Sequence, residues 1–435
     1  MRLVVKFGGT SIKTVGRVRA AARNVARMCA AGNQVLVVVS AMGDATNRLM
    51  RRGREAWAEA PFDQNYLRLL ATGESQSAAV MAMALCGEGQ QAGAIGFDHP
   101  RWPVVAAPGQ TANQRMSAGK VNDVVDVRLD EAESYARFSS VVEPMLAAGM
   151  VPVFPGFFIR EAEAGLVTLG RGGSDVAAFL VGRFARADEV VIVTDVKGVL
   201  SADPRVVKDA RVLPDMSAEV LSAVAHRGAQ VLHPNALRYK PDSVAARVVH
   251  FRDLRRAAFG TRITGAAKTR LTLHPEPLTQ VLLFRPGLAS RTGVLGQIGS
   301  WLSEREIPIH ATTSSDTVVG LYVESGRVSG ALTDLHAAFT GPGRAFDELL
   351  SVGPVAELTL SNPAFVEVPG VISAVADTLG RGGLVIVEMV TTHADVVVYC
   401  RWSDRERAEA LLRERLGLGG NGPRGTANGG RGTEA

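Results

Sequence analysis

Short apolar runs alternate with amphipathic stretches over the first 265 residues of the chain. The apolar runs have the length of strands and are rich in valine, and they cover residues 3–7, 35–40, 151–154, 189–194 and 246–251. Between them, apolar residues recur with helical spacing at residues 15–30, 64–85, 129–147, 175–184 and 218–227. Strands that alternate with helices predict a mostly parallel sheet with helices on both faces. We therefore expect an α/β domain over residues 1–265.

The pattern changes after about residue 270, where two segments of similar size follow each other. Each segment predicts a strand, a glycine-containing turn, a helix, two further strands and a helix. This order is typical of a small βαββαβ sandwich, and its repetition predicts two α+β domains, at residues 277–345 and 353–418, that pack together. Residues 419–435 are poor in apolar side chains and predict a disordered tail.

Composition narrows the class of protein. The chain has 46% hydrophobic and 21% charged residues, as an ordinary globular protein does, and no apolar run is long enough to span a bilayer. Cys29, Cys86 and Cys400 lie far apart without metal-ligand spacing, which predicts reduced thiols and a cytoplasmic location. The net charge of +5 is mild, and the arginines at 48, 51, 52 and 54 favour a solvated helix face over a nucleic-acid surface. Neither a membrane nor a nucleic acid is therefore an expected partner.

The first strand runs directly into the sequence Lys6-Phe7-Gly8-Gly9-Thr10-Ser11. Glycines let backbone amides approach phosphate oxygens, and Lys6 adds a positive charge beside them. This is not the P-loop pattern, because the lysine precedes the glycines. The cluster predicts a phosphoryl-binding turn, and the alternative is a Gly-Gly pair that serves packing alone.

A second glycine-rich turn, Gly170-Arg171-Gly172-Gly173-Ser174-Asp175, opens the helix predicted at residues 175–184. An arginine among glycines at the start of a helix suits a carboxylate or another anion, because the guanidinium, the free amides and the helix dipole all attract negative charge. The alternative for Ser174 and Asp175 is that they only cap the helix.

Polar residues also follow the ends of two other predicted strands, where the sheet of an α/β domain faces its ligand. Ser40 and Thr46 follow the second strand and suit a small polar substrate, or they cap the next helix. Thr194, Asp195, Asp203 and Arg205 suit a nucleotide, or they form a tight turn. Glu74 is a further acidic candidate near a helix start, where it would equally serve as a capping acid.

Together these motifs resemble those of the aspartate kinase (aspartokinase) family, a branch of the amino acid kinases. They occur in the family's order over residues 3–234, and the last is Gly-Ala-Gln-Val-Leu-His-Pro at residues 228–234. Related kinases of glutamate, acetylglutamate or uridylate share the Gly-Gly start but not the whole set. The two sandwiches look like the family's pair of ACT domains, so the resemblance covers nearly all of the chain.

The resemblance implies ATP-dependent phosphorylation of the L-aspartate side chain to 4-phospho-L-aspartate, the first step of lysine, threonine and methionine biosynthesis. It implies catalytic roles for Lys6 and Asp175. It implies an aspartate site formed by Ser40, Thr46, Glu74, Arg171 and Ser174. It implies an ATP site formed by Lys6, Gly8, Gly9, Thr194, Asp195, Asp203 and Arg205, with Mg²⁺ held mainly by the phosphates and by no dedicated protein site.

The resemblance also implies an amino-acid effector, lysine or threonine, bound to the first ACT domain. The residues implied there are Thr292, Gly293, Val294, Leu295, Ile309 and His310. Threonine is favoured, because the sequence offers no evident acid for a lysine side chain. A homo-oligomer formed through the ACT domains is expected, with the second domain mainly pairing with its partner.

Several positions depart from the family pattern. Leu200 replaces a common aromatic residue, Gln230 stands where many members have lysine, and Pro155 replaces a threonine before Gly156 and Phe157. The stretch at residues 94–117 does not match the family either. Two alternatives therefore stay open: a kinase of another small carboxylate in a specialised pathway, and a non-catalytic regulatory relative that binds an amino acid through its ACT domains.

Overall fold

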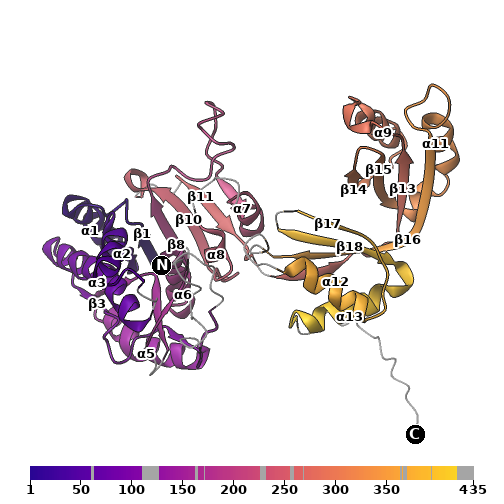
Figure 1. Ribbon diagram of the computed structural model, residues 1–435. Helices are drawn as coiled ribbons and strands as arrows, with labels where there is room; N and C mark the ends of the chain where they lie inside the picture. The colour runs from indigo at the N-terminus through magenta and orange to yellow at the C-terminus, as the bar shows by residue number, and fades with distance from the viewer. Residues whose placement is uncertain are drawn as a thin grey trace, which may run out of the picture. The chain divides into compact units, whose positions relative to one another are not determined.

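The computed structural model describes residues 1–59, 63–109, 127–161, 165–170, 172–225, 232–254, 259–267, 269–362, 365, 370–392 and 394–418. The chain divides into two compact units, Met1–Lys268 and Thr269–Ala435 (Figure 1). Three features named from the sequence lie outside the described residues: Arg171, Gln230 and the tail from residue 419. Among the described helices, none is both long and apolar enough to cross a membrane.

The N-terminal unit is built on an eight-stranded sheet with the strand order β3-β5-β2-β1-β8-β10-β11-β9. All neighbouring strands are parallel except the antiparallel pair β10 and β11. The strands are β1 (Arg2–Phe7), β2 (Gln34–Val39), β3 (Ala92–Ala94), β5 (Val151–Pro155), β8 (Glu189–Thr194), β9 (Asp215–Ser217), β10 (Ala245–His250) and β11 (Thr261–Thr264). This confirms the α/β class predicted from the sequence.

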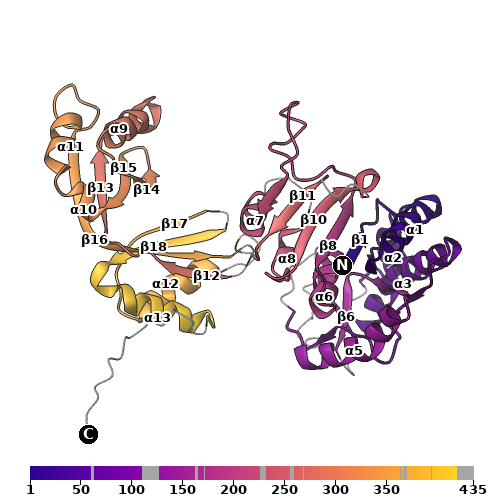
Figure 2. The same ribbon diagram turned by 180° about the vertical axis from the view of Figure 1, so that it is seen from behind.

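Helices cover both faces of this sheet, as Figures 1 and 2 show from opposite sides. They are α1 (Val15–Ala30), α2 (Ala45–Ala56), α3 (Gln64–Gly87), α5 (Glu131–Ala147), α6 (Gly173–Phe184), α7 (Ala218–Ala225) and α8 (Pro234–Leu237), with the 3-10 turn η1 (Phe251–Asp253). Alternate residues of each strand enter different cores: Val4 packs with α5 and α6, whereas Val5 packs with α1. The predicted helix 15–30 is confirmed to the residue.

A smaller three-stranded sheet, β4-β6-β7, lies in the same unit. Its strands are β4 (Val105–Ala106), β6 (Phe158–Glu161) and β7 (Gly165–Thr168). The unusual stretch from residue 94 packs against it through Phe97, whose ring lies 5.7 Å from that of Phe158 in β6. The Trp102 ring lies 4.8 Å from that of Phe97 and 6.2 Å from that of Phe154 in β5. All four rings are buried in the core. Aromatic packing therefore anchors the described part of this stretch, residues 94–109, in the core.

The C-terminal unit contains the predicted repeat. The first copy runs β13 (Leu278–Phe284), η2 (Leu288–Ser290), α9 (Val294–Ser303), β14 (Ile309–Ser314), β15 (Val318–Glu324), α10 (Ser325–Val328) and α11 (Leu332–Phe339). The second runs β16 (Glu348–Ser361), α12 (Val371–Arg381), β17 (Ile386–Thr391), β18 (Asp395–Arg401), η3 (Trp402–Asp404) and α13 (Arg405–Arg415). This antiparallel α+β arrangement is consistent with two ACT domains.

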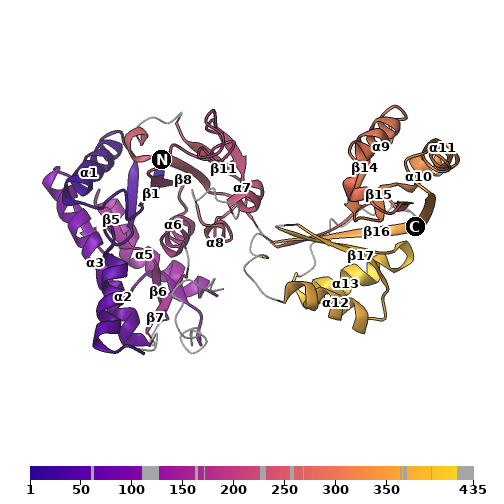
Figure 3. The same ribbon diagram turned by 45° about the horizontal axis from the view of Figure 1, so that its top comes forward.

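One strand joins the two copies. The first part of β16 pairs with β13 and its second part pairs with β18, so the sheet continues from one copy into the other (Figure 3). β12 (Arg270–Leu273) precedes the first copy in sequence but pairs with the second part of β16. The domain limits 277–345 and 353–418 remain a prediction. Residues 270–273, which form β12, lie outside these limits although they pair with a strand of the second copy.

Equivalent tyrosines of the two copies pack against each other. The rings of Tyr322 and Tyr399 are stacked with centroids 3.6 Å apart. Gln280 donates a hydrogen bond to the Tyr322 hydroxyl at 2.7 Å, and the Tyr399 hydroxyl donates to Glu357 at 2.9 Å. Burial raises the pKa of both tyrosines above the ordinary value, and neighbouring glutamates add to the shift. The two copies thus share an uncharged tyrosine pair inside the unit.

Candidate active site

Lys6 lies at the centre of the N-terminal unit, on β1 between β2 and β8. Side chains alternate along a strand, so Lys6 projects from the same face as Val4, toward the core that contains α6. Its ammonium forms an ion pair with Asp175 in the first turn of α6. Only 7% of Lys6 and 9% of Asp175 are exposed. Two residues that lie 169 positions apart in sequence therefore form one buried charge pair.

The glycine turn after β1 is closely packed. The Gly8 amide donates a hydrogen bond to the Val193 carbonyl at 3.3 Å, which ties the turn to the end of β8. A Cβ at Gly9 would lie 2.6 Å from the Ala41 carbonyl oxygen, so a larger residue does not fit there. A Cβ at Gly8 would lie 3.8 Å from Lys6 Nζ. Gly9 is thus required by packing, while a Cβ at Gly8 would make ordinary van der Waals contact with the Val193 carbonyl and the lysine.

Ser40 and Ser174 come together although the sequence separates them widely. Ser40 Oγ donates to Ser174 Oγ at 2.9 Å, which joins the end of β2 to the start of α6. The N-cap of α6 is Gly172, with φ of 73°, and no side chain caps it. The capping alternative for Ser174 and Asp175 is therefore wrong, because their side chains contact Ser40 and Lys6 instead.

Glu74 lies in the middle of α3, which begins at Gln64 and is capped by Asp63. The interpretation of Glu74 as a capping acid near a helix start is therefore wrong, because the helix begins ten residues earlier. Its carboxyl is buried with 5% exposure, and Oε2 has no hydrogen-bond partner. Burial raises the pKa of Glu74 to about 8, while the amides of Ala41 and Gly156 and the Lys6 charge oppose this shift.

Thr46 lies in the first turn of α2 and is half-buried, one residue after Ala45, which lies near Gly73 of α3. Asp44 precedes the helix at the N-cap position, so Thr46 is not the cap. The described residues thus bring Lys6, Glu74, Asp175 and the Ser40–Ser174 pair into one region at the carboxyl ends of the parallel strands. Thr46 lies on the helix that follows β2, and Arg171 lies outside the described residues.

The residues expected on the nucleotide side fall into two groups. Thr194 ends β8 beside the glycine turn, and its hydroxyl donates to Asp195 at 3.2 Å. Asp203 and Arg205 form an exposed ion pair at 2.8 Å, and its hydrogen bonds lower the pKa of Asp203. Among the contacts of the described residues, none joins this pair to Lys6. Leu200 forms a bridge with Val212 in the same loop.

Sequence reasoning did not assign Gly156, Phe157 and His233 to the site. A Cβ at Gly156 would lie 2.8 Å from Ser174 Cβ, and one at Gly173 would lie 2.9 Å from the Phe157 ring. Phe157 adopts a φ of 70°, which is unusual for an aromatic residue. The His233 side chain lies against Gly172 and accepts a hydrogen bond from the Asn235 amide. The sequence signal was present as Pro155-Gly156-Phe157 at a strand end, but it appeared only as a departure from the family.

The predicted effector residues belong to the C-terminal unit. Gly293, with φ of 80°, is the N-cap of α9, and Thr292, Val294 and Leu295 surround it. Ile309 and His310 begin β14 and are exposed. His310 Nε2 lies 3.4 Å from a Glu324 oxygen. Glu324 also pairs with Arg327 at 3.0 Å, so this acid is already neutralised, and the preference for threonine stays a prediction.

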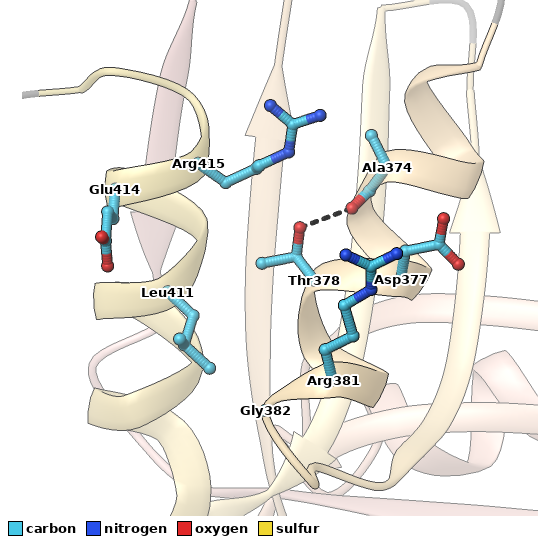
Figure 4. A pocket seen from close by; sticks show the side chains of 8 residues that line it. All are labelled: Ala374, Asp377, Thr378, Arg381, Gly382, Leu411, Glu414 and Arg415. Atoms are coloured by element: carbon cyan, nitrogen blue, oxygen red, sulfur yellow. Dashed lines mark hydrogen bonds between the residues drawn. The ribbon is translucent and has the colours of Figure 1, made fainter.

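A groove of about 580 Å³ lies between α12 and α13 in the second copy of the repeat (Figure 4). The Arg415 side chain extends from α13 across the groove toward α12, and Asp377, Arg381 and Glu414 also line it. Acidic and basic side chains are therefore present in equal number. The groove contains none of the residues predicted for catalysis or effector binding. Among the described residues, no cluster of three or more histidine, cysteine, aspartate or glutamate side chains would hold a metal ion.

Comparison with known proteins places the chain in a family. Residues 1–250 match the model of the amino acid kinase family. The chain therefore belongs to the amino acid kinase family. It is similar to aspartokinase 2 of Bacillus subtilis (strain 168), at 27% identity over 96% of this chain and 98% of that protein. It is also similar to the aspartokinase of Mycobacterium tuberculosis (strain ATCC 25618 / H37Rv), at 29% identity over 97% of both chains.

Solved structures support the same assignment. The aspartate kinase of Synechocystis superposes with a TM-score of 0.78 at 25% identity, over 97% of this chain and 71% of that one. Aspartokinase III of E. coli, solved in complex with aspartate and ADP, shares the fold with a TM-score of 0.51 at 22% identity, over 96% of this chain and 100% of that one. The similarity thus extends through both units.

Proposed function

We propose that this chain is an aspartate kinase, which transfers the γ-phosphoryl group of ATP to the side-chain carboxylate of L-aspartate. The observation that supports this most directly is the buried Lys6–Asp175 pair beside the Gly8-Gly9 turn, with Glu74 and the Ser40–Ser174 pair around it. This cluster of residues combines a positive charge that can bind a phosphoryl group with polar groups that can bind a small amino acid. The near full-length similarity to aspartokinases selects aspartate among small carboxylates.

The reaction needs positioning and charge neutralisation more than proton transfer. The aspartate carboxylate is ionised at neutral pH and attacks the γ-phosphorus without a general base. Lys6 stabilises the negative charge on the transferring group, and Asp175 fixes the position of the Lys6 ammonium. The acyl phosphate forms as the bond between the γ-phosphorus and the bridging oxygen of ADP breaks. Both carboxylate and phosphates are anionic, so Lys6 also reduces their mutual repulsion.

The remaining contacts orient the two substrates. Arg171 binds the α-carboxylate through its planar guanidinium, and Glu74 receives the α-ammonium, while Ser40, Thr46 and Ser174 shape the same site. Gly8 and Gly9 provide the phosphate turn, and Thr194, Asp195, Asp203 and Arg205 contact ATP. Mg²⁺ bound to the phosphates neutralises part of their charge when ATP is present. Asp175 would help to organise this phosphoryl centre, and its carboxylate is paired with Lys6.

The C-terminal unit serves regulation and assembly in this proposal. The amides at the start of α9 bind the carboxylate of an amino-acid effector, and the beginning of β14 receives its amine. A homo-oligomer forms through the ACT domains.

Two observations weigh against the alternatives. The departure at residues 94–117 favoured a different acceptor, but its described aromatic residues, Phe97 and Trp102, are buried and contribute core packing. A non-catalytic relative has no need of the Lys6–Asp175 pair, which costs desolvation energy to bury. An aspartate-specific enzyme therefore fits the residues better than either alternative.

A hydroxamate assay on the purified full chain tests the function, because hydroxylamine traps acyl phosphates. With ATP and Mg²⁺, we expect product from L-aspartate and far less from L-glutamate, succinate or N-acetyl-L-glutamate. Product from another acid in preference to aspartate would reassign the acceptor. Absence of product from every acid, in a folded chain that still binds an amino acid, would support the non-catalytic alternative.

A further inference from the structure

Glu74 is a buried acid that has no positively charged side chain as its own ion-pair partner among the described residues. The nearest ammonium, that of Lys6 on β1, already pairs with Asp175 of α6. Glu74 Oε2 has no hydrogen-bond partner, and the carboxyl is almost completely shielded from water. A second ionised carboxylate here would leave the cluster with one uncompensated buried charge, which is unfavourable.

The surroundings of Glu74 explain which form is stable in the free enzyme. Burial raises the pKa of Glu74 to about 8. The amides of Ala41 and Gly156 and the charge of Lys6 stabilise the carboxylate and lower this pKa, but less than burial raises it. Of the described charged groups, Lys6 is the one that acts on this carboxyl, and Asp175 neutralises Lys6. The segments next to it contribute Ser40 and Ser174, which are uncharged. Burial, the unpartnered Oε2 and the Lys6–Asp175 pair therefore all favour the neutral acid over the carboxylate at Glu74.

We propose that Glu74 is protonated in the free enzyme and releases its proton to solvent when the α-ammonium of the amino-acid substrate binds beside it. This inference rests on the proposed function, which places that ammonium at Glu74. The O–H bond of the carboxyl breaks, the proton leaves to buffer, and the carboxylate pairs with the ammonium. Substrate binding thereby supplies the positive charge that the buried site lacks.

The coupling predicts a specific pH dependence. Below about pH 8 the substrate binds only after Glu74 is deprotonated, so its apparent affinity falls as the pH falls. With a pKa of about 8, the apparent Kd for aspartate rises roughly 50-fold between pH 8 and pH 6. A dicarboxylate without an amine, such as succinate, gives no ion pair at Glu74 and releases no proton.

Titration calorimetry of the full chain with aspartate tests this inference. At about pH 6.5 the ammonium of free aspartate remains protonated, so buffers with different ionisation enthalpies count protons released by the protein. We expect close to one proton per aspartate at that pH and a much smaller release at about pH 8.5, where the ammonium is still mostly protonated and Glu74 is mostly ionised. Aspartate binding without proton release at pH 6.5 would overturn the inference and leave the proposed function intact. Failure of both binding and the hydroxamate assay would instead remove the proposed function.

Two variants separate Glu74 from other sources of protons. Glu74→Gln imitates the neutral acid, so we expect weaker aspartate binding that releases no proton and does not vary over this pH range. Glu161→Gln is the matched control, because Glu161 is another buried glutamate of the same unit and its Oε1 accepts a hydrogen bond from the Gly109 amide. When aspartate binds, the Glu161→Gln variant should release one proton, as the unmodified chain does. Equal proton release by Glu74→Gln would assign the proton to another group.

A measurement on the unmodified protein does not depend on either variant. Difference infrared spectroscopy detects the carbonyl band of a protonated carboxyl group, and aspartate binding should remove one such band at about pH 6.5. Succinate should leave it in place. A spectrum that shows no loss of this band with aspartate would contradict the inference even if the variants failed to fold.

Discussion

The two predicted ligand sites of this chain differ in how they handle charge. In the N-terminal unit, Lys6 and Asp175 are buried and neutralise each other before any substrate arrives. In the C-terminal unit, the turn at Gly293 is open, with Leu295 49% and Ile309 37% exposed. The first site depends on side-chain charges held by a sheet and a helix, and the second depends on backbone amides at a helix start.

This difference has a physical reason. Charges that stabilise a phosphoryl group act more strongly in a site with little water, and they need fixed positions to do so. A site that only senses an amino acid needs reversible binding, which backbone amides and a few exposed groups provide. Substitutions in the first site should therefore change turnover or substrate affinity, and those in the second should change regulation alone.

Removal of Lys6 should have the largest effect. Lys6→Ala should lower kcat roughly 10²-fold or more, because the transition state loses its charge contact. The variant also leaves Asp175 buried without a partner, which costs about 3–5 kcal/mol of stability. Steady-state kinetics with melting curves separates the two effects. The double variant Lys6→Ala/Asp175→Asn should recover stability but not turnover, and a recovery of turnover in it would contradict the role of Lys6.

Removal of Arg171 should affect one substrate. Arg171→Ala should raise the KM for aspartate roughly 10- to 100-fold, the loss expected for a charge-assisted hydrogen bond, and should change the KM for ATP little. Initial rates with each substrate varied in turn provide the test. An equal rise in both KM values would place the arginine on a different ligand.

The effector site should affect activity only when an effector is present. We expect lysine, threonine or both to change activity roughly fivefold or more through the turn at Gly293. Gly293→Ala places a Cβ on a residue with a φ of 80°, so it should weaken this response without a change in the basal rate. Titration with each amino acid, alone and in pairs, measures the response. If none of them shifts activity or melting temperature, the two repeated domains serve assembly only.

Removal of one hydroxyl of the Ser40–Ser174 pair should have the smallest effect on the kinetics. Ser40→Ala removes one neutral hydrogen bond to Ser174, so the KM for aspartate should rise roughly 2- to 10-fold with kcat little changed. Ser201→Ala, on the exposed loop of the same unit, is a suitable control and should leave both constants unchanged. A loss of turnover as large as that of Lys6→Ala would show that the serine pair holds the reacting groups and not only the substrate.

The sequence by itself determined the order of elements. Valine-rich runs and helical spacing predicted five of the parallel strands of the N-terminal unit and helices such as α1, because burial on both faces of a sheet requires such residues. The short edge strands β3 and β9 were not predicted. The repeated strand-turn-helix pattern predicted two similar copies in the C-terminal unit. It did not predict that β16 runs through both copies or that β12 joins the second, because strand pairing depends on partners distant in sequence.

Residue types and motif order also predicted the candidate residues, but not the contacts among them. Lys6 and Asp175, or Ser40 and Ser174, are chosen from local patterns, whereas only the folded sheet brings each pair together. Glu74 shows the difference most clearly. The sequence allowed a capping acid at a helix start, while the tertiary structure places the residue in mid-helix and buries its carboxyl beside an ammonium that is already paired. Its protonation depends on solvent exclusion and neighbouring charge, which are properties of the packed structure and not of the local sequence.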